Sequence, residues 1–309
     1  MKNRTFVALL AAAFLTAIPA ISASFPATKG APVQMVVTVL PEAGSNTPLN
    51  LGADDLSVTI GKNQARFVSS QRLTDGSAAM QLFVLIDNSL PAATLGLHIT
   101  ELKNFLASLP ATTQVAVGYM QNGTFALAEG FTVDHARAAE AVRLPMSIPG
   151  GNGSPYFALS DLVKHWPSKD PTGRRVVLML TDGVDRYYGT STVNDPYVDA
   201  AVSDAAKRGV MVYSIYLRDA GRYDRSGRQA LYGQSRLSIV SGETGGYAYF
   251  MDFSNPVSIS PFLNNLQDRL DHQYQVNVEA FSPRGIQPAQ VRSEIQGVKM
   301  VGPTRIAVE

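Results

Sequence analysis

Apolar and polar positions follow different patterns in different parts of the chain. Short β-branched or alternating stretches bounded by turn residues predict strands at residues 34–40, 56–60 and 65–69. From residue 81 the pattern changes to continuous apolar runs at residues 82–86, 175–180 and 210–217. Such runs are typical of strands that are buried on both faces of a parallel sheet. After residue 272 the alternating pattern returns.

Helical patterns separate these buried strands. After the strand at 82–86, apolar residues recur at helical spacing, as at Leu95, Ile99, Leu102 and Leu106. The pair Asn122-Gly123 is a hairpin signal, so residues 125–128 are expected to run antiparallel at a sheet edge. Strands that alternate with helices predict an α/β fold with a doubly wound, mostly parallel sheet of six strands. With strands numbered along the chain, right-handed crossovers predict the order 3-2-1-4-5-6.

The same patterns predict how the chain is organised. The expected segments are a signal peptide at 1–23, a linker at 24–33, an N-terminal β segment at 34–76, an α/β domain at 77–271 and a C-terminal β segment at 272–309. The two β segments are expected to pack together as one accessory module, because the ends of a compact chain often lie close together.

The first residues indicate export. Lys2 and Arg4 precede an apolar run at residues 6–18, and small residues follow near Ala23. This is the pattern of a secretory signal peptide, and it predicts a mature protein that begins near Ser24 in the periplasm or outside the cell. The alternative is a retained anchor, for which the apolar run is short.

Composition excludes several classes of function. The chain has 309 residues, 45% hydrophobic and 17% charged, with a formal net charge of +1. This near-neutral balance gives no reason to expect binding to nucleic acid or to an anionic membrane. The absence of cysteine excludes disulfides and thiolate metal sites.

Two aspartates follow buried strands at the ends where ligands bind in open α/β sheets. Asp87 ends the strand at 82–86, with Ser89 two residues later, and Asp182 follows the strand at 175–180. Carboxylate and hydroxyl oxygens suit Mg²⁺, Ca²⁺ or Mn²⁺ rather than zinc. The alternative is that each aspartate only caps a turn or helix.

Asp87-Asn88-Ser89 together with Thr181-Asp182-Gly183 resembles the metal-ion-dependent adhesion site of von Willebrand factor A (VWA) domains. The predicted element order over 81–270 is also similar to this family, and residues 37–67 are similar to the β segment that precedes such domains in bacterial VWFA-related proteins. The resemblance implies a VWA-like domain that recognises a protein partner, with an acidic residue of the partner completing the coordination of the ion.

The adhesion-site pattern is incomplete. Pro91 stands where the family has its second serine, and Gly153 stands at the threonine position, with Ser154 beside it as a tentative substitute ligand. Such losses should weaken Mg²⁺ binding, because this ion requires near-ideal octahedral geometry. Two carboxylates without an ion would need another source of compensation, such as water held by Ser154 or an arginine from residues 219–236.

Two long loops after buried strands contain tyrosine and arginine, which are frequent at binding hot spots. The candidate partner-binding residues are Tyr187, Tyr188, Arg222, Tyr223, Arg225 and Arg228. The alternative is that both loops are only solvated connections.

The sequence therefore favours an exported, non-enzymatic protein-recognition module. A metal-free scaffold protein of the cell envelope is the second hypothesis, and a hydrolase with an unrecognised site is the third. No histidine motif accompanies the candidate serines, and the chain has no phosphate-binding loop.

Overall fold

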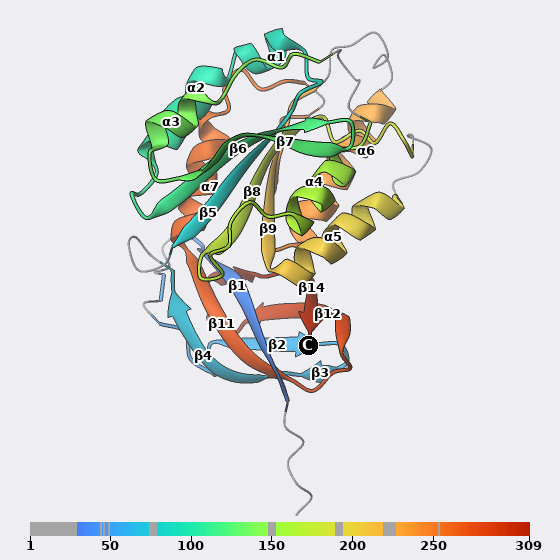
Figure 1. The fold of residues 1–309 in the computed structure, drawn as a ribbon. Helices are drawn as coiled ribbons and strands as arrows, with labels where there is room; N and C mark the ends of the chain where they lie inside the picture. The colour runs from blue at the N-terminus through green and yellow to red at the C-terminus, as the bar shows by residue number, and fades with distance from the viewer. Residues whose placement is uncertain are drawn as a thin grey trace, which may run out of the picture.

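A six-stranded sheet forms the centre of the larger part of the protein (Figure 1). The structure is a computed structural model that describes residues 30–43, 45, 47–48, 50–73, 79–147, 153–188, 194–218, 227–252 and 254–309. The strands, in sheet order, are β10 (Ala248–Tyr249), β9 (Val210–Tyr216), β8 (Arg174–Thr181), β5 (Met80–Asp87), β6 (Thr113–Gln121) and β7 (Thr124–Thr132). Only β7, at one edge, is antiparallel to its neighbour. The expected mixed α/β fold with a mostly parallel sheet is confirmed.

Helices cover both faces of this sheet because its strands are apolar on both sides. Every residue of β5 is buried. One face packs against α1 (Ala92–Gly96), α2 (Ile99–Ser108), α3 (His135–Glu140) and α7 (Ser260–Asp271). The other face packs against α4 (Pro155–Lys164), α5 (Pro196–Arg208) and α6 (Gly227–Glu243).

The two ends of the chain form a second layer of sheets below the first part (Figure 1). One sheet contains β13 (Val298–Val301), β1 (Ala31–Pro41), β11 (Gln273–Ala280) and β4 (Arg66–Arg72). The other contains β14 (Arg305–Val308), β12 (Gly285–Ser293), β2 (Leu56–Ile60) and β3 (Asn63–Gln64). The N-terminal strand β1 pairs with β11 and β13 from the C-terminal part. Apolar side chains of both chain ends share one core.

The predicted linker at 24–33 is too long at its C-terminal end. β1 begins at Ala31, which pairs with Ala280 on β11. The small residues before Gln34 carry little strand signal of their own, and pairing with a distant strand determines their conformation. The predicted signal peptide lies outside the described residues.

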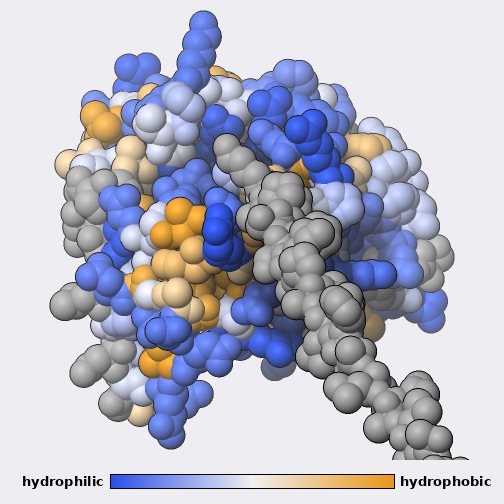
Figure 2. All heavy atoms as spheres, turned by 90° about the horizontal axis from the view of Figure 1, so that it is seen from below, coloured by the Kyte–Doolittle hydropathy of each residue, from blue (hydrophilic) through white to orange (hydrophobic). Residues whose placement is uncertain are grey.

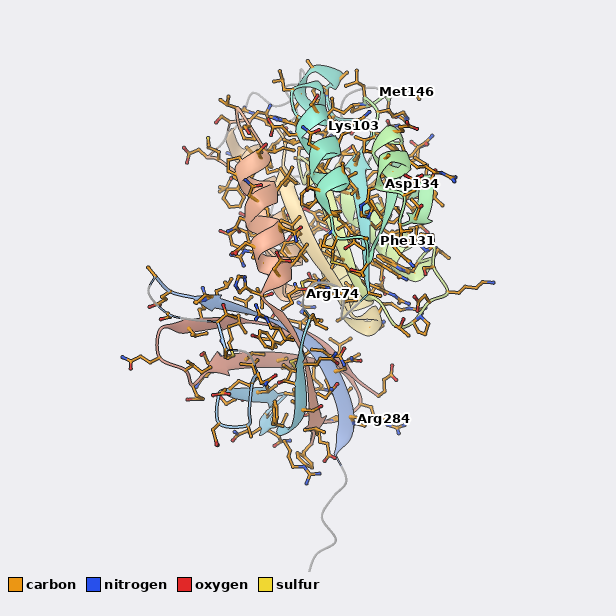
Figure 3. All side chains as sticks on the ribbon, turned by 90° about the vertical axis from the view of Figure 1, so that its left-hand side faces the viewer. Lys103, Phe131, Asp134, Met146, Arg174 and Arg284 are labelled. Atoms are coloured by element: carbon orange, nitrogen blue, oxygen red, sulfur yellow. The ribbon has the colours of Figure 1, made fainter. Side chains whose placement is uncertain are left out.

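Polar contacts connect the two parts. Arg305 forms ion pairs with Asp199 on α5 and Glu243 on α6. Arg174 donates a hydrogen bond to the backbone oxygen of Leu270 (2.9 Å) and another to the side chain of Gln273 at the start of β11. Figure 3 shows Arg174 at the junction between the helical part and the sheets below it.

A carboxylate from one helix caps another. Oε2 of Glu101 on α2 accepts hydrogen bonds from the backbone N–H groups of Ile259 and Ser260, both 2.7 Å long, at the start of α7. Burial alone would raise the pKa of Glu101, but these bonds and those from the hydroxyls of Ser258 and Ser260 outweigh burial and lower it. Glu101 and Ile259 are far apart in sequence, so local patterns did not predict this contact.

No helix in the described ranges is long and apolar enough to cross a membrane. Viewed from below, the sheet layer carries a group of apolar residues surrounded by hydrophilic ones (Figure 2).

Candidate functional site

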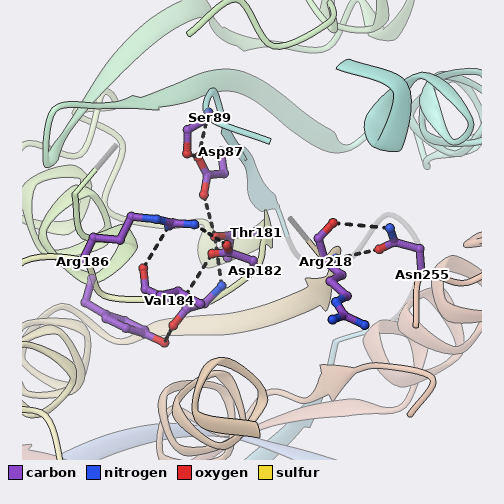
Figure 4. Close-up of polar contacts among 10 residues, drawn as sticks. Asp87, Ser89, Thr181, Asp182, Val184, Arg186, Arg218 and Asn255 are labelled. Carbon is purple, nitrogen blue, oxygen red and sulfur yellow. Dashed lines mark hydrogen bonds and ion pairs between the residues drawn. The ribbon is translucent and has the colours of Figure 1, made fainter. Parts of the chain in front are cut away.

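The strand-end acids lie together because β5 and β8 are parallel neighbours. Ile86 pairs with Leu180 in the register, so Asp87 and Thr181 end their strands side by side. The hydroxyl of Thr181 donates to Oδ2 of Asp87 over 2.8 Å (Figure 4). Asp182 is the next residue and is close enough for its charge to interact with that of Asp87.

Donors of the protein surround Asp87. Its Oδ1 accepts hydrogen bonds from the backbone N–H (2.9 Å) and the hydroxyl (2.7 Å) of Ser89. Asp87 and Ser89 are both 2% exposed. The Asp87-Asn88-Ser89 loop therefore forms a closed turn in which the aspartate bonds to the residue two positions later.

Asn88, between these two residues, holds the neighbouring segment. Its side-chain oxygen accepts from the backbone N–H of Met146 (3.0 Å) and from Nη1 of Arg143 (3.2 Å). Its amide nitrogen donates to the hydroxyl of Ser147 over 2.8 Å. The same side of the molecule exposes Leu144 and Met146, which are 44% and 75% accessible.

An arginine neutralises Asp182. Nη2 of Arg186 lies 2.7 Å from Oδ2 of Asp182, and the backbone N–H of Val184 donates to Oδ1 over 3.0 Å (Figure 4). Asp182 is 3% exposed. Burial raises its pKa to about 6, the charge of Asp87 raises it as well, and Arg186 counteracts both.

The arginine bonded to Asp182 belongs to the loop after β8, whereas the expected arginine from residues 219–236 falls largely outside the described residues. Arg222 and Arg225, like Tyr223, lie outside the described residues, and Arg228 is exposed at the start of α6. Arg186 follows Asp182 by four residues, and closeness within one loop is the only hint that the sequence offers for this contact.

Ser154 has a structural role at the start of a helix. It caps α4, and its hydroxyl donates a short hydrogen bond to Asp185, which is fully buried. Oδ1 of Asp185 in turn accepts from the backbone N–H groups of Tyr187 and Tyr188, both 2.8 Å long. The proposed substitute ligand thus anchors the loop that follows Asp182.

At the two positions that depart from the family pattern, Pro91 and Gly153, no side-chain oxygen is available as a metal ligand. Pro91 precedes α1 and forms no side-chain hydrogen bond. Gly153 has a φ of +78°, and a Cβ there would lie 2.3 Å from Cε2 of Tyr187. The ring of Tyr187 therefore occupies the space that a threonine side chain would need.

These residues do not suit a divalent ion. Asp182 is already bonded to a guanidinium, and Ser89 donates its hydroxyl proton to Asp87. The described residues also contain no group of three or more His, Cys, Asp or Glu side chains that could hold a metal ion. A divalent cation would have to displace or repel Arg186.

Aromatic side chains pack together in and near the loop that contains Arg186. We define the aromatic cluster as Phe157, Tyr187, Tyr188 and Tyr197. Phe157 lies 5.6 Å from Tyr187 and 4.2 Å from Tyr197, and Tyr188 lies 6.0 Å from Tyr197, all between ring centroids. Tyr187 and Tyr188 remain 60% and 39% exposed. The cluster is thus an aromatic surface whose rings support one another, and Arg186 directly precedes two of them in the chain.

Comparisons with known proteins concern only the fold. No family model and no curated protein matches the sequence. Among solved structures, the chain is similar to BatB from Bacteroides thetaiotaomicron (14% identity, TM-score 0.43, 62% of this chain and 98% of that one). It is also similar to the pilus adhesin SpaC from Lactobacillus rhamnosus GG (12% identity, TM-score 0.46, 87% of this chain and 42% of that one). A third similar structure is proximal thread matrix protein 1 from the mussel byssus, whose MIDAS motif holds zinc (16% identity, TM-score 0.44, 67% of this chain and 49% of that one).

The observed architecture is the mixed α/β fold that the resemblance to VWA domains implies. It has a mostly parallel six-stranded sheet, and Asp87 ends β5. At the identities and TM-scores above, no residue role transfers from the VWA-like neighbours to this chain. The role of the site must therefore follow from its own contacts.

Proposed function

We propose that this protein is an exported, non-enzymatic recognition module that binds a protein partner through the loops at the carboxyl ends of β5 and β8. Binding requires no metal ion, because Arg186 supplies the positive charge. The observation that carries this proposal is that Arg186 pairs with the buried Asp182 and directly precedes the exposed Tyr187 and Tyr188 in the chain.

The aromatic cluster is suited to contact a partner. Tyrosine combines a large apolar area with a polar end and loses little conformational entropy on binding. The backbone of Tyr187 and Tyr188 is already fixed by Asp185, so less order has to be imposed when a partner binds.

Arg186 indicates the chemistry of the partner. Its side chain is 27% exposed, so it is accessible from outside while it neutralises Asp182. Guanidinium groups pair readily with carboxylates. An acidic residue of the partner is therefore the expected group at this position.

The contacts of the candidate serines favour binding over catalysis. The hydroxyls of Ser89 and Ser154 both donate to aspartates. Among hydrogen bonds in the described part of the chain, His135, His165 and His272 contact Thr113, Asp161 and Asp268 rather than either serine. Neither serine thus has the histidine partner that commonly activates a serine nucleophile.

Site-specific photo-crosslinking in the source cell tests this function. A photoreactive aromatic residue replaces Tyr187 in one strain and Tyr247 in another. Tyr247 is 45% exposed and directly precedes β10, an edge strand of the sheet. We expect a discrete adduct from position 187 only, retained in the presence of EDTA and lost when Arg186→Glu is added. Equal adducts from both positions, or loss of the adduct with EDTA, would contradict the proposal.

A further inference from the structure

A second candidate site lies at the opposite end of the central sheet. A cavity of about 390 Å³ separates the helical part from the sheets of the chain ends. Its walls are the starts of β8 and β9, the end of α5, parts of β1 and β11, and residues 303–306. The volume is within the range of sites for small molecules.

The charged residues that line this cavity have one sign. Its described lining contains no aspartate or glutamate and five basic residues: Arg174, Arg175, Lys207, Arg208 and Arg305. A cavity with low-dielectric walls and charges of one sign concentrates the field and attracts ions of opposite charge. The lining therefore favours an anion.

Three of these cations have partners within the protein. Arg305 pairs with Asp199 and Glu243, and Arg174 donates to the chain around Gln273. Lys207 lies 3.9 Å from Asp204. The contacts of Arg305 and Arg174 join the two parts of the protein, and all three pairings reduce the charge that a ligand would meet.

Arg175 and Arg208 provide the charge that remains. Burial lowers the pKa of Arg175, and the like charge of Arg208 lowers it further, while Asp170 acts in the opposite direction. Arg175 also lies over the ring of Trp166, 5.7 Å from its centroid, and this contact helps to fix its position. Two guanidinium groups that repel one another are stabilised by an anion placed between them.

Uncharged donors complete the wall. The side chains of Gln34 and Gln275 come from neighbouring antiparallel strands and line the same cavity. Amide groups of this kind orient an anion without adding charge.

We propose that this junction cavity binds a small organic anion with carboxylate or phosphate groups, held between Arg175 and Arg208. The ligand would contact both the helical part and the strands of the chain ends, so binding stabilises their junction. This site is separate from the proposed partner-binding loops, and its test does not depend on them.

Thermal unfolding and calorimetry with simple probes test the proposal. Purified protein is titrated with inorganic phosphate and with citrate, against sodium chloride at matched ionic strength. We expect a saturable rise in Tm and measurable binding heat with at least one probe. Response to phosphate alone indicates a phosphorylated ligand, and response to citrate alone indicates a polycarboxylate.

Variants show where the anion binds. Arg208→Gln changes an exposed side chain, so it should fold normally and weaken the affinity at least tenfold. Arg284→Gln removes an exposed charge from the lower sheets, away from the cavity (Figure 3), and should leave the affinity unchanged. No saturable response in the wild type, or equal losses in both variants, would overturn the proposal.

Discussion

Replacing Arg186 by glutamine tests whether this side chain stabilises the buried acid. Arg186→Gln removes the cation that lies 2.7 Å from Asp182, whose side chain is 5% exposed. Hydrogen bonds to charged groups contribute about 1.5–3 kcal/mol each, and the partial exposure of Arg186 places the expected loss near the middle of that range, about 2 kcal/mol.

The effect should depend on pH in one direction. The pKa of Asp182 is raised from 3.8 to about 6, so Asp182 lowers stability as pH rises through that interval. At pH 5 a group with a pKa of about 6 is roughly nine-tenths protonated, so little of the ion pair exists to be lost. Removing Arg186 raises the pKa further, so the variant continues to lose stability, relative to the wild type, as pH rises above about 6.

Urea unfolding at pH 5 and pH 8 measures this difference. We expect Arg186→Gln to be destabilised by about 2 kcal/mol at pH 8 and by much less at pH 5. Arg228→Gln, at an exposed position on α6, is the control and should change stability little at either pH. An equal loss at both pH values would show that the ion pair with Asp182 is not the cause.

Magnesium provides a second measurement on the same variant. Without Arg186, Asp182 loses the cation bonded to it, and a Kd of about 1 mM at about 10 mM Mg²⁺ would stabilise the variant by roughly 1.4 kcal/mol. We expect no such gain in the wild type. If the wild type gains as much as the variant, Arg186 does not occupy the place of an ion.

Three further predictions concern the fold and the start of the chain. Glu101→Gln should destabilise the protein by about 1 kcal/mol at pH 7. Because the pKa of Glu101 is lowered in the folded state, this difference should disappear as pH falls through that pKa, as urea unfolding at pH 7 and pH 3 would show. Gly118→Ala places a Cβ 2.6 Å from the ring of Phe83 and should cost about 1–3 kcal/mol in thermal unfolding, whereas Gly130→Ala has open space and should cost much less. Mass spectrometry of the exported protein should find an N-terminus near Ser24, and an intact Met1 would contradict export with cleavage.

Sequence patterns predicted the elements of the central sheet because burial on both faces leaves a strong local signal. The apolar run at 82–86 became β5, in which every residue is buried. The Asn122-Gly123 hairpin became the turn between β6 and β7, with Asn122 at a φ of +51°. Local sequence could not predict that β1 begins at Ala31, because a distant strand stabilises that residue.

Sequence patterns predicted that the strand-end acids lie together but did not predict the contacts that they make. Asp87 and Asp182 follow from the ends of buried strands, which parallel pairing brings to one edge. The contact of Arg186 with Asp182 depends on the path of an irregular loop, for which periodicity gives no information. The role of Asn88 also depends on a segment more than fifty residues later in the chain.

The loss of metal ligands and the presence of Arg186 are parts of one arrangement. The backbone N–H of Arg186 donates to the oxygen of Gly153 over 2.7 Å, which places the ring of Tyr187 against Gly153 and the guanidinium against Asp182. One short loop thus fills the space of a missing ligand and neutralises the charge that a metal ion would neutralise. Restoring only the family residues, by Pro91→Ser with Gly153→Thr, should therefore fail to create Mg²⁺ affinity. The threonine would require a strained φ of +78° and would collide with Tyr187. A site with both family ligands can form only after Arg186 and Tyr187 are removed, so calorimetry should detect tighter Mg²⁺ binding than in Arg186→Gln alone when Arg186→Gln and Tyr187→Ala precede the other two changes.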